Sequence, residues 1–136
     1  MTKAEAKKYL SRVKDIIRAE NRILDQIRRL EDRQLTITRQ ISDMPRGTTP
    51  FTTLDYVVEL DELRHKLVNE HQQEVKAYRE ILQVLNQLNG IERDIMIMHY
   101  LMMLTWEEIA CRIEKSYRWT QKLHGRALEK VVIILS

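Results

Sequence analysis

The residues with the clearest chemistry are the positive charges near the end of the chain. Between Lys115 and Lys130, five Lys or Arg stand against one Glu, a local charge of +4, whereas the whole chain carries +3. Such a cluster can neutralise the phosphates of a nucleic acid and is the usual electrostatic mark of a DNA- or RNA-binding surface. A basic helix can also be an ordinary solvated face, so the residues before it decide between the two interpretations.

Those preceding residues predict two short helices joined by a tight turn. The segment Thr105–Glu108 (Thr-Trp-Glu-Glu) has the form of a capping box, in which the Thr105 hydroxyl accepts a backbone N–H and Glu108 reaches back to the N–H of Thr105. Glu114-Lys115 is the predicted turn, and Ser116 is the predicted N-cap of the next helix. A short helix, a turn and a basic second helix are typical of a helix-turn-helix, which places its last helix in the DNA major groove.

The two faces of this last helix have different predicted roles. The predicted buried stripe consists of Thr120, Leu123, Ala127, Leu128 and Val131. The predicted exposed face consists of Tyr117, Arg118, Gln121, Lys122, His124 and Arg126. Because the first turns of such a helix enter the groove, we expect base-edge contacts from Tyr117, Arg118, Gln121 and Lys122. The predicted phosphate contacts are Thr105, Lys115, Ser116, Arg126 and Lys130.

The stretch from Thr105 to Lys130 resembles region four of bacterial sigma factors, which reads the −35 promoter element. The shared frame is an acidic capping box, an aliphatic-small pair, a Ser or Thr that opens the reading helix, and a basic-Ala-Leu-x-Lys ending. Where a primary sigma factor typically carries Arg-Glu-Arg, this chain carries Tyr117-Arg118-Trp119, so we expect a different DNA target. For Trp119 we favour a packing role.

Two further runs are similar to small phage-encoded transcription regulators of the ArpU/RinA type, found in prophages of Gram-positive bacteria. They are Leu-His-Gly-Arg-Ala-Leu at 123–128 and Ser-Asp-Met-Pro-Arg-Gly at 42–47. The resemblance implies an activator of late or packaging genes, with double-stranded promoter or operator DNA as its partner and host RNA polymerase as a second candidate partner.

Two long amphipathic helices are predicted before this module. Residues 3–42 and 53–88 both carry apolar residues at three-four spacing, and the proline-rich stretch 43–52 separates them. Residues 1–50 carry +5 and residues 51–90 carry −3, which favours pairing of the two helices. We therefore predict an all-α protein: a coiled-coil-like antiparallel hairpin over 1–88, and a helix-turn-helix domain over 89–136. Gly90 is the predicted left-handed residue between them, and a homodimer is an open alternative to a monomer.

Other classes of protein find little support in the sequence. One cysteine excludes an internal disulfide framework, and there is no apolar run of membrane-spanning length or signal-peptide pattern, so we expect a location in the bacterial cytoplasm. No catalytic motif, cofactor motif or metal-ligand spacing is present, so we expect neither an enzyme nor a cofactor nor a metal site. We expect Cys111 to be a small buried or half-buried hydrophobe, and the methionines between 96 and 103 to pack in the core.

Two other functions stay open on this sequence. A phage packaging protein such as a small terminase subunit also combines a helix-turn-helix with helical oligomerisation, and it would form a ring of eight or more subunits. A polymerase-binding interaction module would use the same helices without reading bases.

Overall fold

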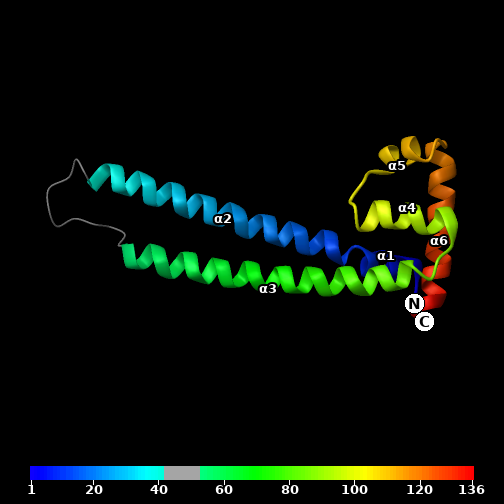
Figure 1. The fold of residues 1–136 in the computed structure, drawn as a ribbon, viewed down its shortest axis with the longest axis horizontal. Helices are drawn as coiled ribbons and strands as arrows, with labels where there is room; N and C mark the ends of the chain where they lie inside the picture. Colours follow the sequence, from blue (N-terminus) through cyan, green and yellow to red (C-terminus); the bar gives the residue numbers. More distant parts are fainter. Residues whose placement is uncertain (42–52) are drawn as a thin grey trace. The chain divides into compact units, whose positions relative to one another are not determined.

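The computed structural model describes residues 1–41 and 53–136, and over these residues the chain is helical, with no β-strand (Figure 1). The prediction of an all-α protein is confirmed. The predicted proline-rich loop at 43–52, and with it the run 42–47, lies outside the described residues. None of the helices in the described part combines the length and the apolarity that a membrane crossing requires. The helices are α1 (Lys3–Leu10), α2 (Arg12–Ile41), α3 (Thr53–Leu85), α4 (Gly90–Tyr100), α5 (Trp106–Arg112) and α6 (Tyr117–Leu135).

The chain forms two compact units. The helix-turn-helix unit consists of residues 1–16 and 73–136, and the hairpin unit consists of the described residues between 17 and 72. The long helices α2 and α3 each contribute residues to both units. The helix-turn-helix unit therefore takes in the N-terminal segment as well as α4, α5 and α6. The functional division predicted at residue 88 stays a prediction.

The sequence predicted one continuous helix over residues 3–42. The structure instead has two helices in this stretch, with a break at Ser11. Thr2 caps α1 through a complete capping box with Glu5, and α1 ends at Leu10, with Ser11 as the C-cap residue, where ψ is 0°. Leu10 and Val13 on either side of the break are almost completely buried, at 0% and 1% exposure. The break divides the predicted helix into α1, which packs on α6, and α2, which pairs with α3.

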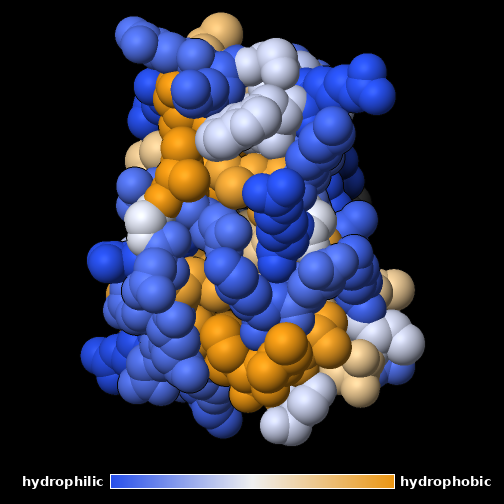
Figure 2. All heavy atoms as spheres, turned by 90° about the vertical axis from the view of Figure 1, so that its right-hand side faces the viewer, coloured by the Kyte–Doolittle hydropathy of each residue, from blue (hydrophilic) through white to orange (hydrophobic). Residues whose placement is uncertain are grey.

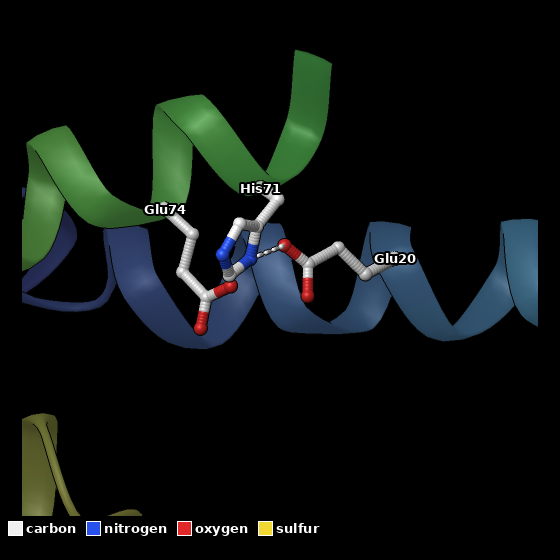
Figure 3. A group of neighbouring side chains, drawn as sticks. All are labelled: Glu20, His71 and Glu74. Atoms are coloured by element: carbon white, nitrogen blue, oxygen red, sulfur yellow. Dashed lines mark ion pairs between the residues drawn. The ribbon is translucent and has the colours of Figure 1, made fainter. Parts of the chain in front are cut away.

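In the hairpin unit, α2 and α3 pack against each other through a small apolar cluster. Its buried members are Leu30, Ile37 and Leu60, and Ile27, Tyr56 and Leu63 surround them. Near the other end of this unit Glu20 Oε1 of α2 lies 3.7 Å from His71 Nδ1 of α3, and Figure 3 shows the ring turned toward that carboxylate. Early residues of α2 thus meet late residues of α3, so the helices are antiparallel and the predicted hairpin is confirmed.

The hairpin unit leaves much of its apolar surface uncovered. The predicted stripe of α3 is only partly buried, since Leu54 is 71% exposed and Val57 is 52% exposed. On α2, Leu35 is 55% exposed. A groove of about 460 Å³ with both polar and apolar walls lies along the pair, lined by Leu30 and Leu63 among others. Two helices alone can bury only one side of each other.

The helix-turn-helix unit has a closed core. Side chains from α1, α3, α4, α5 and α6 are fully buried in it: Leu10, Ile81, Leu85, Ile95, Met96, Ile109 and Val131. Gly90 has a φ of +60°, so the predicted left-handed conformation is confirmed. Its position differs from the prediction, because α3 already ends at Leu85 and Gly90 opens α4 rather than capping α3. Asn89 precedes it as the N-cap residue.

Candidate nucleic-acid interface

The start of α5 is capped by Thr105. The backbone N–H of Glu108 donates to Thr105 Oγ1 at 3.2 Å, and the Thr105 hydroxyl donates to Glu108 Oε1 at 3.1 Å. The predicted N-cap is confirmed, although the Glu108 carboxylate accepts from the hydroxyl rather than from the Thr105 N–H. The hydroxyl of Thr105 is thereby already engaged within the protein, which reduces its availability for a phosphate.

The turn between α5 and α6 is a Schellman motif built without glycine. The N–H of Lys115 donates to the carbonyl of Ala110 at 3.0 Å, and the N–H of Glu114 donates to that of Cys111 at 3.3 Å. Glu114 adopts the left-handed conformation, with φ of +56°, that this motif requires. The predicted turn at Glu114-Lys115 is confirmed, and it fixes the angle between α5 and α6.

Ser116 then opens α6 as predicted. Its side chain accepts from the N–H of Trp119 at 3.1 Å, and its carbonyl accepts from the buried Thr120 hydroxyl at 2.9 Å. The caps at Thr105 and Ser116 and the turn between them define both helix starts. Together they hold the first turn of α6 in one orientation.

The two faces of α6 divide nearly as predicted. The whole predicted stripe is buried: Thr120, Leu123, Ala127, Leu128 and Val131. On the other face Tyr117, Arg118, Lys122 and Arg126 are exposed and Gln121 is half-buried. His124 was predicted on this exposed face, and that prediction is wrong, because only 6% of His124 is exposed.

His124 belongs to an aromatic cluster that the sequence did not reveal, in which Tyr100 and His124 are buried and His99 and Trp106 are half-buried. Its Nε2 lies 2.8 Å from the Tyr100 hydroxyl. The Trp106 ring lies 4.3 Å from His124 and stacks on His99 at 4.0 Å. His99 in turn donates from Nδ1 to the carbonyl of Leu104 at 3.0 Å. The cluster connects α4, the start of α5 and the middle of α6, so it helps to position α6.

Burial sets the protonation of this cluster. Burial is the largest cause, and together with the neighbouring Lys7, His99 and Lys3 it lowers the pKa of His124 to about 4. Burial also lowers the pKa of His99 and raises that of Tyr100. At neutral pH the two imidazoles are therefore neutral. The Tyr100 hydroxyl is protonated, so it can donate a hydrogen bond to His124 Nε2.

The cations of α6 differ in whether they are already paired. Lys130 Nζ lies 2.6 Å from Glu92 Oε2, so this predicted phosphate contact is occupied by an ion pair inside the unit. Among the described residues no carboxylate pairs with Arg118, Lys122 or Arg126. These side chains remain available for an anionic partner. Lys115 lies over the ring of Trp119, with 5.4 Å between Nζ and the ring centroid.

Some predicted core positions are instead at the surface. Cys111 on α5 is exposed, as are Met102 at 52% and Met103 at 39% in the segment after α4, where Met103 adopts a left-handed conformation. Met96 is fully buried as predicted. Trp119, at 38% exposure, lies at the surface beside Lys115 rather than inside the core. Its predicted packing role stays a prediction.

The surface around α6 is mixed. Figure 2 faces the side of the molecule that carries α6 in Figure 1, and hydrophilic residues form most of it. Apolar residues gather near its lower edge, the side on which α6 ends in Figure 1. Ile133, in the last turn of α6, is 74% exposed. The first turns of α6 thus present charge and polarity, and its last turn presents an apolar side chain.

Comparison with known proteins bears on this part of the chain. Residues 78–131 match the family model described as Sigma-70, region 4. Neither the comparison with curated proteins nor that with solved structures gave a match. The matched residues run from the end of α3 through most of α6 and include every predicted DNA contact. Residues 78–131 therefore form a sigma-70 region 4-like helix-turn-helix domain, which is the mark of a DNA-binding regulatory role.

Proposed function

We propose that this protein is a sequence-specific DNA-binding transcription regulator encoded by a phage or prophage, of the ArpU/RinA type, and that it activates late or packaging genes. The observation that carries the proposal is the exposed face of α6, on which Arg118, Lys122 and Arg126 have no carboxylate partner among the described residues. The Ser116 cap and the Schellman turn hold the first turn of this helix. Such a protein acts in the bacterial cytoplasm on double-stranded DNA and needs neither a cofactor nor an enzymatic step.

The roles of the α6 side chains follow from their positions. Tyr117, Arg118, Gln121 and Lys122 lie on the first two turns, so they would face base edges, where Arg or Lys suits guanine and Gln suits adenine. Lys115, Ser116 and Arg126, with Thr105 of the preceding cap, would contact phosphates and set the register on the duplex. The departure from Arg-Glu-Arg at residues 117–119 supports a target other than the −35 element.

The test is an electrophoretic mobility shift with DNA that flanks the gene for this protein. The Arg118→Ala, Lys122→Ala double variant should bind at least about tenfold more weakly, because each good base contact contributes roughly 1–3 kcal/mol. The matched control is Arg64→Ala, Lys66→Ala, which removes the same charge from exposed positions of the hairpin unit. Wild-type affinity in the α6 variant, with an unchanged dependence on salt, would refute the role given to α6.

Two measurements separate this proposal from its rivals. A complex mass that corresponds to eight or more subunits would favour a packaging protein such as a small terminase subunit, whereas a monomer or dimer agrees with a regulator. Salt-insensitive capture of RNA polymerase without a specific DNA site would favour a polymerase-binding module. Footprinting adds the form of the target, because a palindromic site reports a two-fold dimer.

A further inference from the structure

The N-terminal segment, residues 1–16, lies outside the stretch that matches region 4 and yet belongs to the same compact unit. It is anchored there by Ala6, Leu10 and Val13, which are 0–1% exposed, and α1 packs on α6. Arg12 Nη2 also donates to Glu80 Oε2 of α3 at 2.8 Å. A segment held this firmly adds a fixed surface to the helix-turn-helix.

Lysines of this segment lie along that surface. Lys3 Nζ pairs with Glu129 Oε1 of α6 at 3.1 Å. The charge of Lys7 is close enough to disfavour protonation of both His99 and His124, and that of Lys14 does the same for His99. Positive charge from the N-terminal segment therefore reaches the elements that position the reading helix.

Lys14 has the most specific place of these lysines. It lines a pocket of about 270 Å³ together with Thr105 and Glu107 at the start of α5, Tyr117 at the start of α6, and the segment Met103–Leu104. Thr105 and Tyr117 are a predicted phosphate contact and a predicted base contact. Lys14 is half-buried, and among the described residues no carboxylate, including Glu107 in the same pocket, forms an ion pair with it.

We propose that residues 1–16 are part of the DNA-binding surface and that Lys14 binds a backbone phosphate beside Tyr117. The inference rests on the function proposed above and deepens it, because it adds a contact from the opposite end of the chain. The feature that favours a phosphate is the Lys14 ammonium, with which no carboxylate of the described residues forms an ion pair. The Glu107 carboxylate at the same pocket opposes an anion, and the charge of Lys14 offsets that repulsion. Since a phosphate carries no base identity, the contact would serve all DNA sequences alike.

The experiment measures how DNA affinity depends on salt for the full-length protein and three single variants. Each phosphate contact contributes about 0.9 to the slope of log K against log salt concentration. Lys14→Ala should reduce the magnitude of that slope by about 0.9, both on the specific site and on unrelated duplex DNA. Lys14→Arg should restore the wild-type slope. Lys8→Ala is the matched control, because Lys8 is an exposed lysine of the same segment that does not line the pocket.

Three outcomes would overturn the inference. They are a wild-type slope in Lys14→Ala, an equal loss in Lys14→Ala and Lys8→Ala, and a loss confined to one DNA sequence. A thermal melt of each variant verifies that the fold is intact. The Arg118→Ala, Lys122→Ala variant separates the two proposals: if it weakens binding and Lys14→Ala does not, only the role of Lys14 fails, whereas normal binding by both removes the proposed function as well.

Discussion

The helix-turn-helix unit and the hairpin unit are both built from amphipathic helices, but they bury their apolar residues to different degrees. In the helix-turn-helix unit Leu10, Leu85 and Ile109 have no exposed surface. In the hairpin unit the most buried members of the cluster still expose 6–9%, while Leu35 exposes 55%. Several short helices can enclose a centre, whereas two long ones cover only one side of each other. The first unit is thus a closed scaffold for a site, and the second leaves an apolar surface that a second copy could cover.

The largest expected effect tests this contrast with the same change in both units. Leu10→Ala should lower the free energy of unfolding by about 2–5 kcal/mol, because it leaves a cavity in a closed core. Leu35→Ala should change it by no more than about 0.5 kcal/mol, because its side chain is already in water. Chemical denaturation of both variants, followed by circular dichroism, measures the two values.

The outcome at Leu35 also reports on assembly. A cost at Leu35 that approaches the cost at Leu10 and shrinks on dilution would mean that another copy of the chain covers α2. The homodimer left open by the sequence would then become the better description, and the contrast between the two units would hold for the single chain only.

The next effect depends on pH and on His124. Its pKa is about 4 in the folded protein and about 6.5 in an unfolded chain, so between these values only the unfolded state binds the proton. The stabilisation is therefore complete above pH 6.5 and is lost as the pH falls toward 4. The loss is about 3 kcal/mol, and the lowered pKa of His99 acts in the same direction.

Denaturation at a series of pH values measures this loss. The stability advantage of the wild type over His124→Gln should shrink by that amount between pH 6.5 and 4. His65→Gln, in the hairpin unit, controls for the loss of an imidazole as such. An advantage that stayed constant with pH would show that His124 is not buried in the neutral form.

The sequence predicted those parts of the site that depend on local rules. Caps at Thr105 and Ser116, the turn at Glu114 and the buried stripe of α6 each depend on residues within one or two helical turns, and all are present. His124 was assigned to the wrong face because its polarity outweighed its position between Thr120 and Leu128. Helical spacing alone placed it at the edge of the buried stripe.

What the sequence could not predict depends on contacts between distant segments. No Gly or Pro marks the break at Ser11 in the sequence. The break separates α1, which packs on the distant helix α6, from α2. The pairing of Lys130 with Glu92 likewise joins residues 38 positions apart. The exposed part of the α3 stripe has the spacing of a buried face but no partner in this chain to bury it. Spacing shows which side of a helix is apolar, not whether anything covers it.

A smaller effect distinguishes two glycines of the helix-turn-helix unit. An added Cβ meets no atom within 4 Å at Gly125, in the middle of α6, so Gly125→Ala should raise stability by about 1 kcal/mol through helix propensity alone. Gly90→Ala should lower it by about 1–2 kcal/mol, because φ at this position is +60°. Thermal melts compare the two variants.

The DNA affinity of Gly125→Ala is a second measurement, because position 125 follows Lys122 by about one turn of α6. A gain in stability together with a loss of affinity would place Gly125 in the DNA contact.

The smallest expected effect concerns Lys130, where the sequence-based and structural assignments differ. If its ion pair with Glu92 persists in the complex, Lys130→Ala should leave the salt dependence of DNA binding unchanged, whereas Arg126→Ala should lower the slope by about 0.9. The same Lys130→Ala change should alter stability by about 0–1 kcal/mol, because the lysine end of the pair is more than half exposed. Equal losses of slope in both variants would mean that DNA draws Lys130 away from Glu92, and the phosphate-binding face of α6 would then extend one turn further toward its apolar end.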